Sequence, residues 1–229
     1  HLLFLLFAES LGRILKLNSV ERISVIYSNS ANLIIPIVIT LFGSEWVIYT
    51  SGYIVIQIIL LWTHGRMTLC GGEKFNFKKI ICNINMIAIF AGIFLLRIPL
   101  PGIISNSISS VSNMIGPLGM IIAGMLIADI PFSKLFISKR LYLVSALRLI
   151  ICPLLVLLIL KYSGLAGLDR NGNIILMISL LSASTPAAAT ITQMAQIYGK
   201  DVDYANAIYA VTTICCIITM PVIIALYQL

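Results

Sequence analysis

The chain has 229 residues, of which 60% are hydrophobic and only 10% are charged, and its formal net charge is +7. Soluble domains carry about 25% charged residues, so this composition excludes a soluble fold and indicates an all-α polytopic membrane protein. The five cysteines lie mostly in apolar stretches without metal-ligand spacing. We therefore expect no disulfide, metal or cofactor.

Eight apolar segments follow one another along the chain, and each is a candidate for crossing a bilayer, which takes roughly 20 residues. They are 1–15, 23–44, 47–63, 80–96, 98–128, 141–160, 171–199 and 204–229. The first segment begins at His1 without a basic flank or a cleavage site. We therefore expect an N-terminally truncated chain rather than a signal peptide.

The basic residues are distributed unevenly between the loops. One side of the membrane collects most of the 15 Lys and Arg residues, namely Arg13, Lys16, Arg22, Arg66, Lys74, Lys78, Lys79, Lys134, Lys139, Arg140 and Lys200. The other side has Arg97, Lys161 and Arg170. Because cytoplasmic loops are rich in Lys and Arg, the first side is predicted to be cytoplasmic. The positive charge is thus a topology signal, and we expect no nucleic-acid partner.

Two segments contain a proline after a polar run, Pro36 in 23–43 and Pro186 in 172–198. Proline lacks the backbone donor and clashes with the preceding turn, so we predict that each helix breaks or kinks at its proline. Lipid cannot satisfy the freed carbonyls, so such breaks must be covered by protein or water. Paired interruptions of this kind are typical of the substrate site of a secondary transporter.

The two prolines are 150 residues apart, and each broken helix follows a helix that carries an arginine. This offset predicts two repeats of five helices, of which this chain holds eight of ten. Since five is odd, the repeats insert in opposite orientations and form an inverted repeat. Residues 64–79 are then the cytoplasmic loop between the repeats.

The order of these motifs resembles the auxin efflux carrier family, within the superfamily of bile-acid, arsenite and riboflavin transporters. Residues 28–37 resemble the Gly-Asn-x-x-x-x-Gly-x-Pro-Leu signature of its fourth helix. Further matches to its seventh to tenth helices are Pro117, Gly124, Arg148, Pro153, the run Ser184-Thr185-Pro186, Ala195, Tyr198, Gly199, Thr212, Thr213 and Pro221. The chain departs from the family at Ser28, Ala31 and Ile34, where glycines are common, and at Ile84, where a proline is usual.

The resemblance implies a ten-helix fold in which the broken helices cross in a moving transport domain. Residues 1–63 and 129–229 then belong to the transport domain, as helices 3–5 and 8–10, and residues 80–128 to the scaffold, as helices 6–7. It also implies a homodimer formed through the scaffold. Members carry auxin in plants and are linked to small dicarboxylates such as malonate or malate in bacteria.

The crossed breaks are predicted to bind an anion. In each broken helix, the part after the break begins with unpaired amides and about half a positive charge. Two such N-termini that face each other form an anion site without a fixed cation. We expect Asn29, Asn32, Ser184 and Thr185 to donate hydrogen bonds to a substrate carboxylate. The alternative is that these groups only cap the broken backbone and join helices.

Two further residues are candidates for the pathway. Arg148 lies well inside a predicted span, where it either faces a cavity or a partner or extends to the cytoplasmic surface. Gln193 either lines the pathway or bonds across a helix interface. Glu9 and Arg13 are expected to form a structural i, i+4 pair, and His64 is assigned no chemistry.

We therefore expect a multi-pass permease for small organic anions, in the bacterial plasma membrane, that works by alternating access. The coupling ion, H⁺ or Na⁺, stays open. The alternatives are a sodium-coupled bile-acid-type symporter, an intramembrane enzyme and a structural or channel-like bundle. The chain lacks His pairs with Glu and paired intramembrane Asp, so a non-enzyme is favoured.

Overall fold

The computed structural model of the protein describes residues 2–71, 84–95, 98–114 and 138–229, with a few positions between 117 and 128. The N-terminal part contains α1 (Leu2–Ile14), α2 (Ser19–Ile26), α3 (Ser30–Phe42), η1 (Ser44–Trp46), α4 (Val47–Leu60), η2 (Leu61–Gly65) and α5 (Arg66–Leu69). The middle contains α7 (Ile84–Leu95) and α8 (Gly102–Asn113). The C-terminal part contains α11 (Lys139–Ala146), η3 (Leu147–Ile151), α12 (Cys152–Tyr162), η4 (Leu165–Leu168), α13 (Gly172–Ala183), α14 (Ala189–Ile197) and α15 (Val202–Gln228).

Apolar helices dominate the described part of the chain, as expected for a membrane protein. Three of them are long and apolar enough to span a bilayer, Ser44–Leu69, Lys139–Tyr162 and Val202–Gln228. Two shorter apolar helices, Asn32–Phe42 and Gly172–Ala183, belong to the interrupted segments. The all-α membrane fold is therefore confirmed.

The first interruption lies earlier than the sequence predicted. The helix breaks at Tyr27–Asn29, between α2 and α3, whereas Pro36 is an exposed residue inside α3. The predicted break at Pro36 is therefore wrong. Proline at this position removes the hydrogen bond to the Asn32 carbonyl, and α3 nevertheless continues through it to Phe42.

The second interruption contains its proline. α13 ends at Ala183 and α14 begins at Ala189, and Pro186 lies in the extended segment between them. Pro186 needs no donor there, because the segment is not helical. The two interruptions thus arise from different local sequences.

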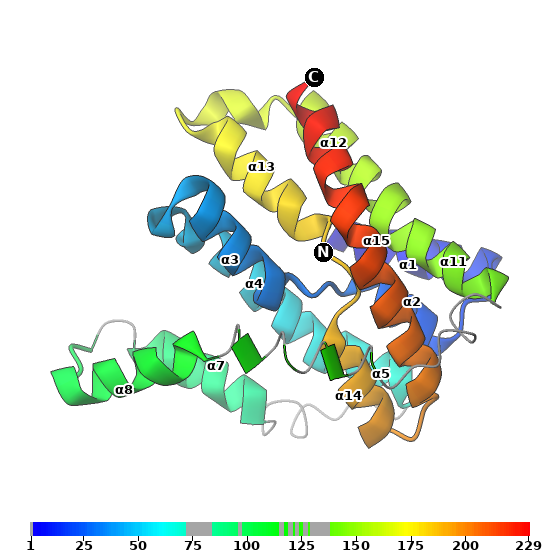
Figure 1. The fold of residues 1–229 in the computed structure, drawn as a ribbon, viewed down its shortest axis with the longest axis horizontal. Coiled ribbons are helices and arrows are strands. Elements are labelled where there is room, and N and C mark those ends of the chain that lie inside the picture. Colours follow the sequence, from blue (N-terminus) through cyan, green and yellow to red (C-terminus); the bar gives the residue numbers. More distant parts are fainter. Residues whose placement is uncertain are drawn as a thin grey trace.

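The two interrupted helices cross near the middle of the bundle, as Figure 1 shows by the approach of the α2–α3 and α13–α14 connections. A large buried cluster surrounds one side of this crossing and includes Ile26, Tyr27, Ala187 and Ile208. By contrast, α7 and α8 extend away from the bundle, and all their side chains that the structure describes are exposed. The predicted loop 64–79 and scaffold segment 80–128 lie partly outside the described residues.

A buried carboxylate joins three helices at one end of the bundle. The Glu21 side chain is fully buried and accepts hydrogen bonds from Arg140 Nη2 at 2.9 Å and Tyr204 Oη at 2.8 Å. It also accepts the Asn18 amide at 2.7 Å, which completes a capping box at the start of α2. Arg140 donates in addition to the carbonyl of Lys16. Glu21 therefore holds α2, α11 and α15 together at this end of the bundle, away from the crossing.

Candidate functional site: the crossover of two interrupted helices

The two breaks pair with each other through their backbones. The backbone amide of Asn29 donates to the Pro186 carbonyl at 2.8 Å, and the backbone amide of Ala188 donates to the Tyr27 carbonyl at 3.1 Å. Ser28 and Ala187 form the antiparallel bridge between these bonds. Each break thus satisfies backbone groups that a helix would otherwise have satisfied, as the apolar interior requires.

Gln57 of α4 holds the first break. Its Oε1 accepts from Ser28 Oγ at 2.6 Å and from Ser30 Oγ at 3.2 Å, and its Nε2 donates to the Ser28 carbonyl. Gln57 is buried. The sequence analysis missed this residue, although it is the only amide side chain in the apolar segment 47–63 and such a residue is a signal in itself.

Arg148 holds the carbonyl ends around the second break. Its guanidinium donates to the carbonyls of Thr185, Val25 and Ala183, each at 3.0 Å. Val25 and Ala183 lie at the C-terminal ends of α2 and α13, where the helix dipole is negative and a cation is stabilised. The side chain is fully buried, and its Cζ lies 5.3 Å from the centre of the Phe4 ring.

These contacts decide between the two interpretations of Arg148 that the sequence left open. Arg148 does not extend to the surface, because the carbonyls of the interrupted helices are its partners. The crossover also contains a fixed cation, since the guanidinium contacts both broken helices, and the binding of an anion by the helix ends alone stays a prediction. No salt bridge joins Arg148 to an acidic residue in the described part of the chain, so carbonyl dipoles are what oppose its charge there.

Arg148 lies in an irregular turn. Residues Leu147–Ile151 form a π-helix between α11 and α12, and a second π-helix, Leu61–Gly65, lies between α4 and α5. π-Helical turns are rare in proteins, and those that occur often lie at functional sites. Both helices that flank the crossing thus carry a local irregularity near it.

The N-terminal ends of α3 and α14 meet the crossing without a side-chain cap. Asn29 precedes α3 and Ala188 precedes α14, and neither side chain bonds to the first turn of its helix. By comparison, α15 is capped by the Asp201 side chain. The Ile191 amide donates to the Ala188 carbonyl at 3.0 Å, and no side chain bonds to the other first-turn amides of α3 and α14 among the described residues. Helix ends of this kind are the arrangement that binds anions.

Of the predicted binding residues, Asn29 and Asn32 lie together at the start of α3. Asn32 Nδ2 donates to Asn29 Oδ1 at 3.1 Å. Among the described residues, no partner accepts from the side-chain NH₂ group (Nδ2) of Asn29 or donates to Asn32 Oδ1. Both groups therefore remain able to bind a ligand. Asn29 is 8% exposed, and Asn32 is half-buried.

Ser184 and Thr185 lie in the second break but donate to their own helix. Ser184 Oγ donates to the Leu180 carbonyl at 2.8 Å, and Thr185 Oγ1 donates to the Ser182 carbonyl at 2.9 Å. Both residues are buried. In this conformation their hydroxyl oxygens can only accept, which corresponds to the capping alternative.

The remaining predicted residue, Gln193, is exposed on α14, and no hydrogen bond joins it to another described residue. Thr212 of α15, which belonged only to the family pattern, contacts the crossing directly. Its Oγ1 accepts the Ala187 amide at 3.2 Å and donates to its own helix. α15 thus supplies a third support for the second break.

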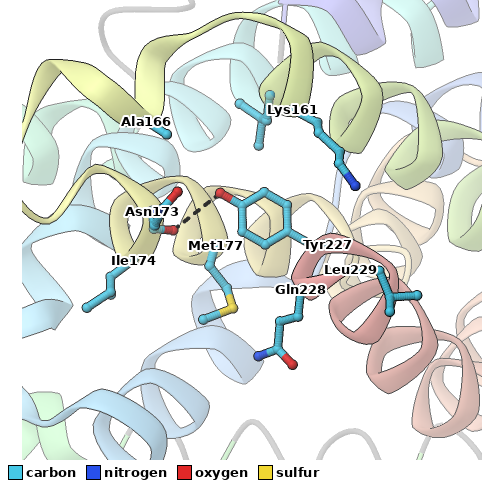
Figure 2. Close-up of a pocket in the computed structure, with 9 residues that line it drawn as sticks. Lys161, Ala166, Asn173, Ile174, Met177, Tyr227, Gln228 and Leu229 are labelled. Carbon is cyan, nitrogen blue, oxygen red and sulfur yellow. Dashed lines mark hydrogen bonds between the residues drawn. The ribbon is translucent and has the colours of Figure 1, made fainter.

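A cavity of about 460 Å³ opens elsewhere, between the ends of α12, α13 and α15 (Figure 2). Its lining includes Lys161, Asn173, Met177 and Tyr227, and the Tyr227 hydroxyl donates to the Asn173 carbonyl at 3.4 Å. None of the predicted binding residues lines this cavity. The described residues also contain no group of His, Cys, Asp and Glu able to hold a metal ion.

Comparison with known proteins gives one result. The model of a protein family described as "Membrane transport protein" matches residues 66–224, which is more than half of the chain and includes the second break and Arg148. No match was found among curated proteins or among solved structures.

Proposed function

Because the chain belongs to this membrane transport protein family, that of the auxin efflux carriers, it is a membrane transporter, and we propose that it carries small organic anions such as carboxylates. The substrate binds at the crossover of the two interrupted helices. Transport proceeds by alternating access.

One observation carries this proposal: two helix N-termini without side-chain caps meet at the crossing, beside a fully buried guanidinium. The unpaired amides of α3 and α14 favour an acceptor with negative charge. Arg148 adds a full positive charge within hydrogen-bonding distance of Thr185 in the second break. A cation would meet repulsion from both features, and a neutral sugar would gain no attraction between opposite charges.

We assign the direct contacts to Asn29 and Asn32. Their free amide groups donate to a carboxylate without adding a charge to the apolar interior. Ser184 and Thr185 shape the opposite side of the site and accept hydrogen bonds from a hydroxyl or a protonated acid. Substrates with both a carboxylate and a hydroxyl, such as malate, suit this combination.

For the movement, we propose that the crossed helices form a transport domain that moves against a scaffold containing α7 and α8. The network around Glu21 joins α2, α11 and α15, so this part moves as one body. The exposed side chains of α7 and α8 suit a surface against which it slides. The inverted five-helix repeat, the homodimer and the bacterial plasma membrane belong to the same proposal.

Uptake of radiolabelled malate and malonate into proteoliposomes tests the assignment. Asn29→Ala removes a hydrogen bond to a charged group, which is worth about 1.5–3 kcal/mol, so uptake at low substrate concentration falls by roughly tenfold or more. Asn29→Asp abolishes it, because a carboxylate repels the substrate. Thr40→Ala, an exposed site about three turns further along α3, is the matched control and retains uptake.

The same preparations exclude trivial outcomes. Each variant must show the thermal unfolding midpoint of the parent protein before its transport is compared. Unimpaired malate uptake by both Asn29 variants would overturn the site assignment. A preference for amines or sugars in a competition assay would overturn the substrate class.

A further inference from the structure

A second polar group lies beside the crossover and is not used by the anion site. Tyr27 is fully buried in the first break, and its carbonyl accepts the Ala188 amide from the second break. Its hydroxyl oxygen lies 2.9 Å from the Leu60 carbonyl and 2.9 Å from His64 Nδ1. Tyr27 therefore connects the crossing directly to a titratable side chain.

His64 is placed by the π-helical turn Leu61–Gly65. A Cβ at Gly65 would lie only 3.1 Å from Tyr27 Cε2, so the glycine lets the tyrosine ring approach this turn. On the other side of the imidazole, Nε2 lies 3.6 Å from Glu9 Oε1 and 3.5 Å from Thr68 Oγ1. His64, to which the sequence analysis assigned no chemistry, thus has an acidic neighbour that comes from α1.

The hydrogen atoms available in this group leave one position unfilled. Tyr27 has one hydroxyl proton, and when it is donated to Leu60, His64 Nδ1–H must donate to the tyrosine oxygen. Thr68 donates its own proton to the His64 carbonyl at 2.9 Å. His64 Nε2 then faces a carboxylate oxygen and a hydroxyl oxygen that has no proton to offer, and three acceptors meet without a donor.

A proton on Nε2 resolves this arrangement. It turns the contact with Glu9 into an ion pair and leaves the bonds from His64 to Tyr27 and from Tyr27 to Leu60 intact. Without that proton, the neutral imidazole satisfies Glu9 only as the Nε2–H tautomer. Nδ1 must then accept the Tyr27 proton, and the Leu60 carbonyl loses its bond from the tyrosine and keeps the one from Thr63 Oγ1 at 3.3 Å. Protonation therefore changes the bonding of a residue in the crossing.

The charged groups around His64 come from each neighbouring element. Glu9 lies on α1, and its second oxygen is 3.7 Å from Arg22 Nη1 on α2. On α5, Arg66 has its guanidinium over the ring of Tyr198, at the end of α14, at 5.9 Å. The side chains of His64, Glu9 and Arg22 are 26%, 29% and 31% exposed, whereas Tyr27 is fully buried. The site is thus open toward the basic end of the bundle and closed toward the crossing.

We propose that His64 and Glu9 form a proton-binding site for the coupling ion, and that Tyr27 transmits its occupation to the crossover. This inference rests on the proposed transport function. One proton binds at His64 Nε2 in one step of the cycle and leaves in another. The change in the hydrogen bond of Tyr27 biases how the two breaks pair, and this links proton binding to substrate binding.

Proton binding is tested first, without any substrate. The chain has two histidines, so a His1→Gln protein with ¹⁵N-labelled histidine gives a signal from His64 alone in lipid nanodiscs. We expect this imidazole to change from neutral to doubly protonated between pH 8 and pH 5, as histidine switches do. In Glu9→Gln the protonated fraction at a given pH falls about threefold or more, since an anionic neighbour is lost. A His64 signal that stays neutral to pH 5 would overturn the proposal.

Coupling is tested with proteoliposomes whose membrane potential is clamped with potassium and valinomycin. If one proton is coupled to each anion, a pH gradient of one unit drives about tenfold accumulation of labelled malate inside the vesicles. This accumulation occurs for one orientation of the gradient and not for the reverse orientation. His64→Gln abolishes this accumulation and keeps malate exchange at equal pH, which a merely structural role would not allow. Tyr27→Phe keeps the titration of His64 and weakens accumulation. Ser51→Ala, at an exposed position of α4 whose hydroxyl donates to the Val47 carbonyl, is the control and keeps both.

The outcomes separate the two proposals. Malate transport that is independent of the pH gradient overturns the coupling and leaves the transport function standing. Titration of His64 without transport of any organic acid overturns the proposed function, and the coupling with it. Loss of both exchange and accumulation in a folded His64→Gln protein shows a structural role and also overturns the coupling.

Discussion

The two breaks that cross in this protein are stabilised by different means. The first, Tyr27–Asn29, contains no proline, and Gln57 and the second break satisfy its polar groups. The second, Ser184–Ala188, contains Pro186, and its neighbouring carbonyls are bound by Arg148. The comparison shows that a helix opens in a membrane where partners exist for the freed groups. A proline favours such a position but does not determine it.

If this comparison is correct, Arg148 is the most sensitive residue, because it serves both interrupted helices. Arg148→Met leaves three buried carbonyls without a donor, each at a cost of about 1–3 kcal/mol. We expect the unfolding midpoint in detergent to fall by roughly 6–12 °C or more. Arg148→Lys keeps the charge but not the forked geometry, so its loss is intermediate.

Lys161→Met, at an exposed position of α12, is the control. It leaves the unfolding midpoint within about a degree, as surface substitutions do. A stable Arg148→Met protein with unchanged transport would show that the carbonyls find other donors. That result would contradict the stabilisation of the second break by Arg148.

Gln57→Leu tests the first break alone. The Ser28 carbonyl loses its donor and two hydroxyls lose an acceptor, for a cost of about 2–3 kcal/mol. Hydrogen exchange should accelerate around residues 27–31 more than around residues 184–188, where Arg148 and Thr212 remain. Ser51→Ala, exposed on the same helix, is the control, and equal acceleration at both breaks would contradict the division of roles.

The smallest effects concern the prolines themselves. Pro186→Ala gains a donor that the extended break does not need and adds freedom to the unfolded chain, so stability falls by about 0.4–1 kcal/mol. Pro36→Ala restores a hydrogen bond inside α3, so stability does not fall. Differential scanning calorimetry of the two proteins in the same detergent measures the contrast. A larger loss from Pro36→Ala than from Pro186→Ala would reverse the interpretation.

Several features could be predicted because they depend on composition and local chemistry. The apolar segments predicted a helical membrane protein, and the motif order indicated the family that the comparison confirms. The second break was located because Pro186 cannot continue the helix that precedes it. These signals act within a few turns of the chain and need no knowledge of its neighbours.

The rest was decided by contacts between distant segments. The first break lies at Tyr27–Asn29 because the second break and Gln57 are there to bond it. Likewise, Glu9 contacts Arg22 and His64, not the Arg13 expected from helical spacing. In an apolar interior a polar group takes the partner that the packing brings within reach, and that choice depends on helices far apart in the sequence.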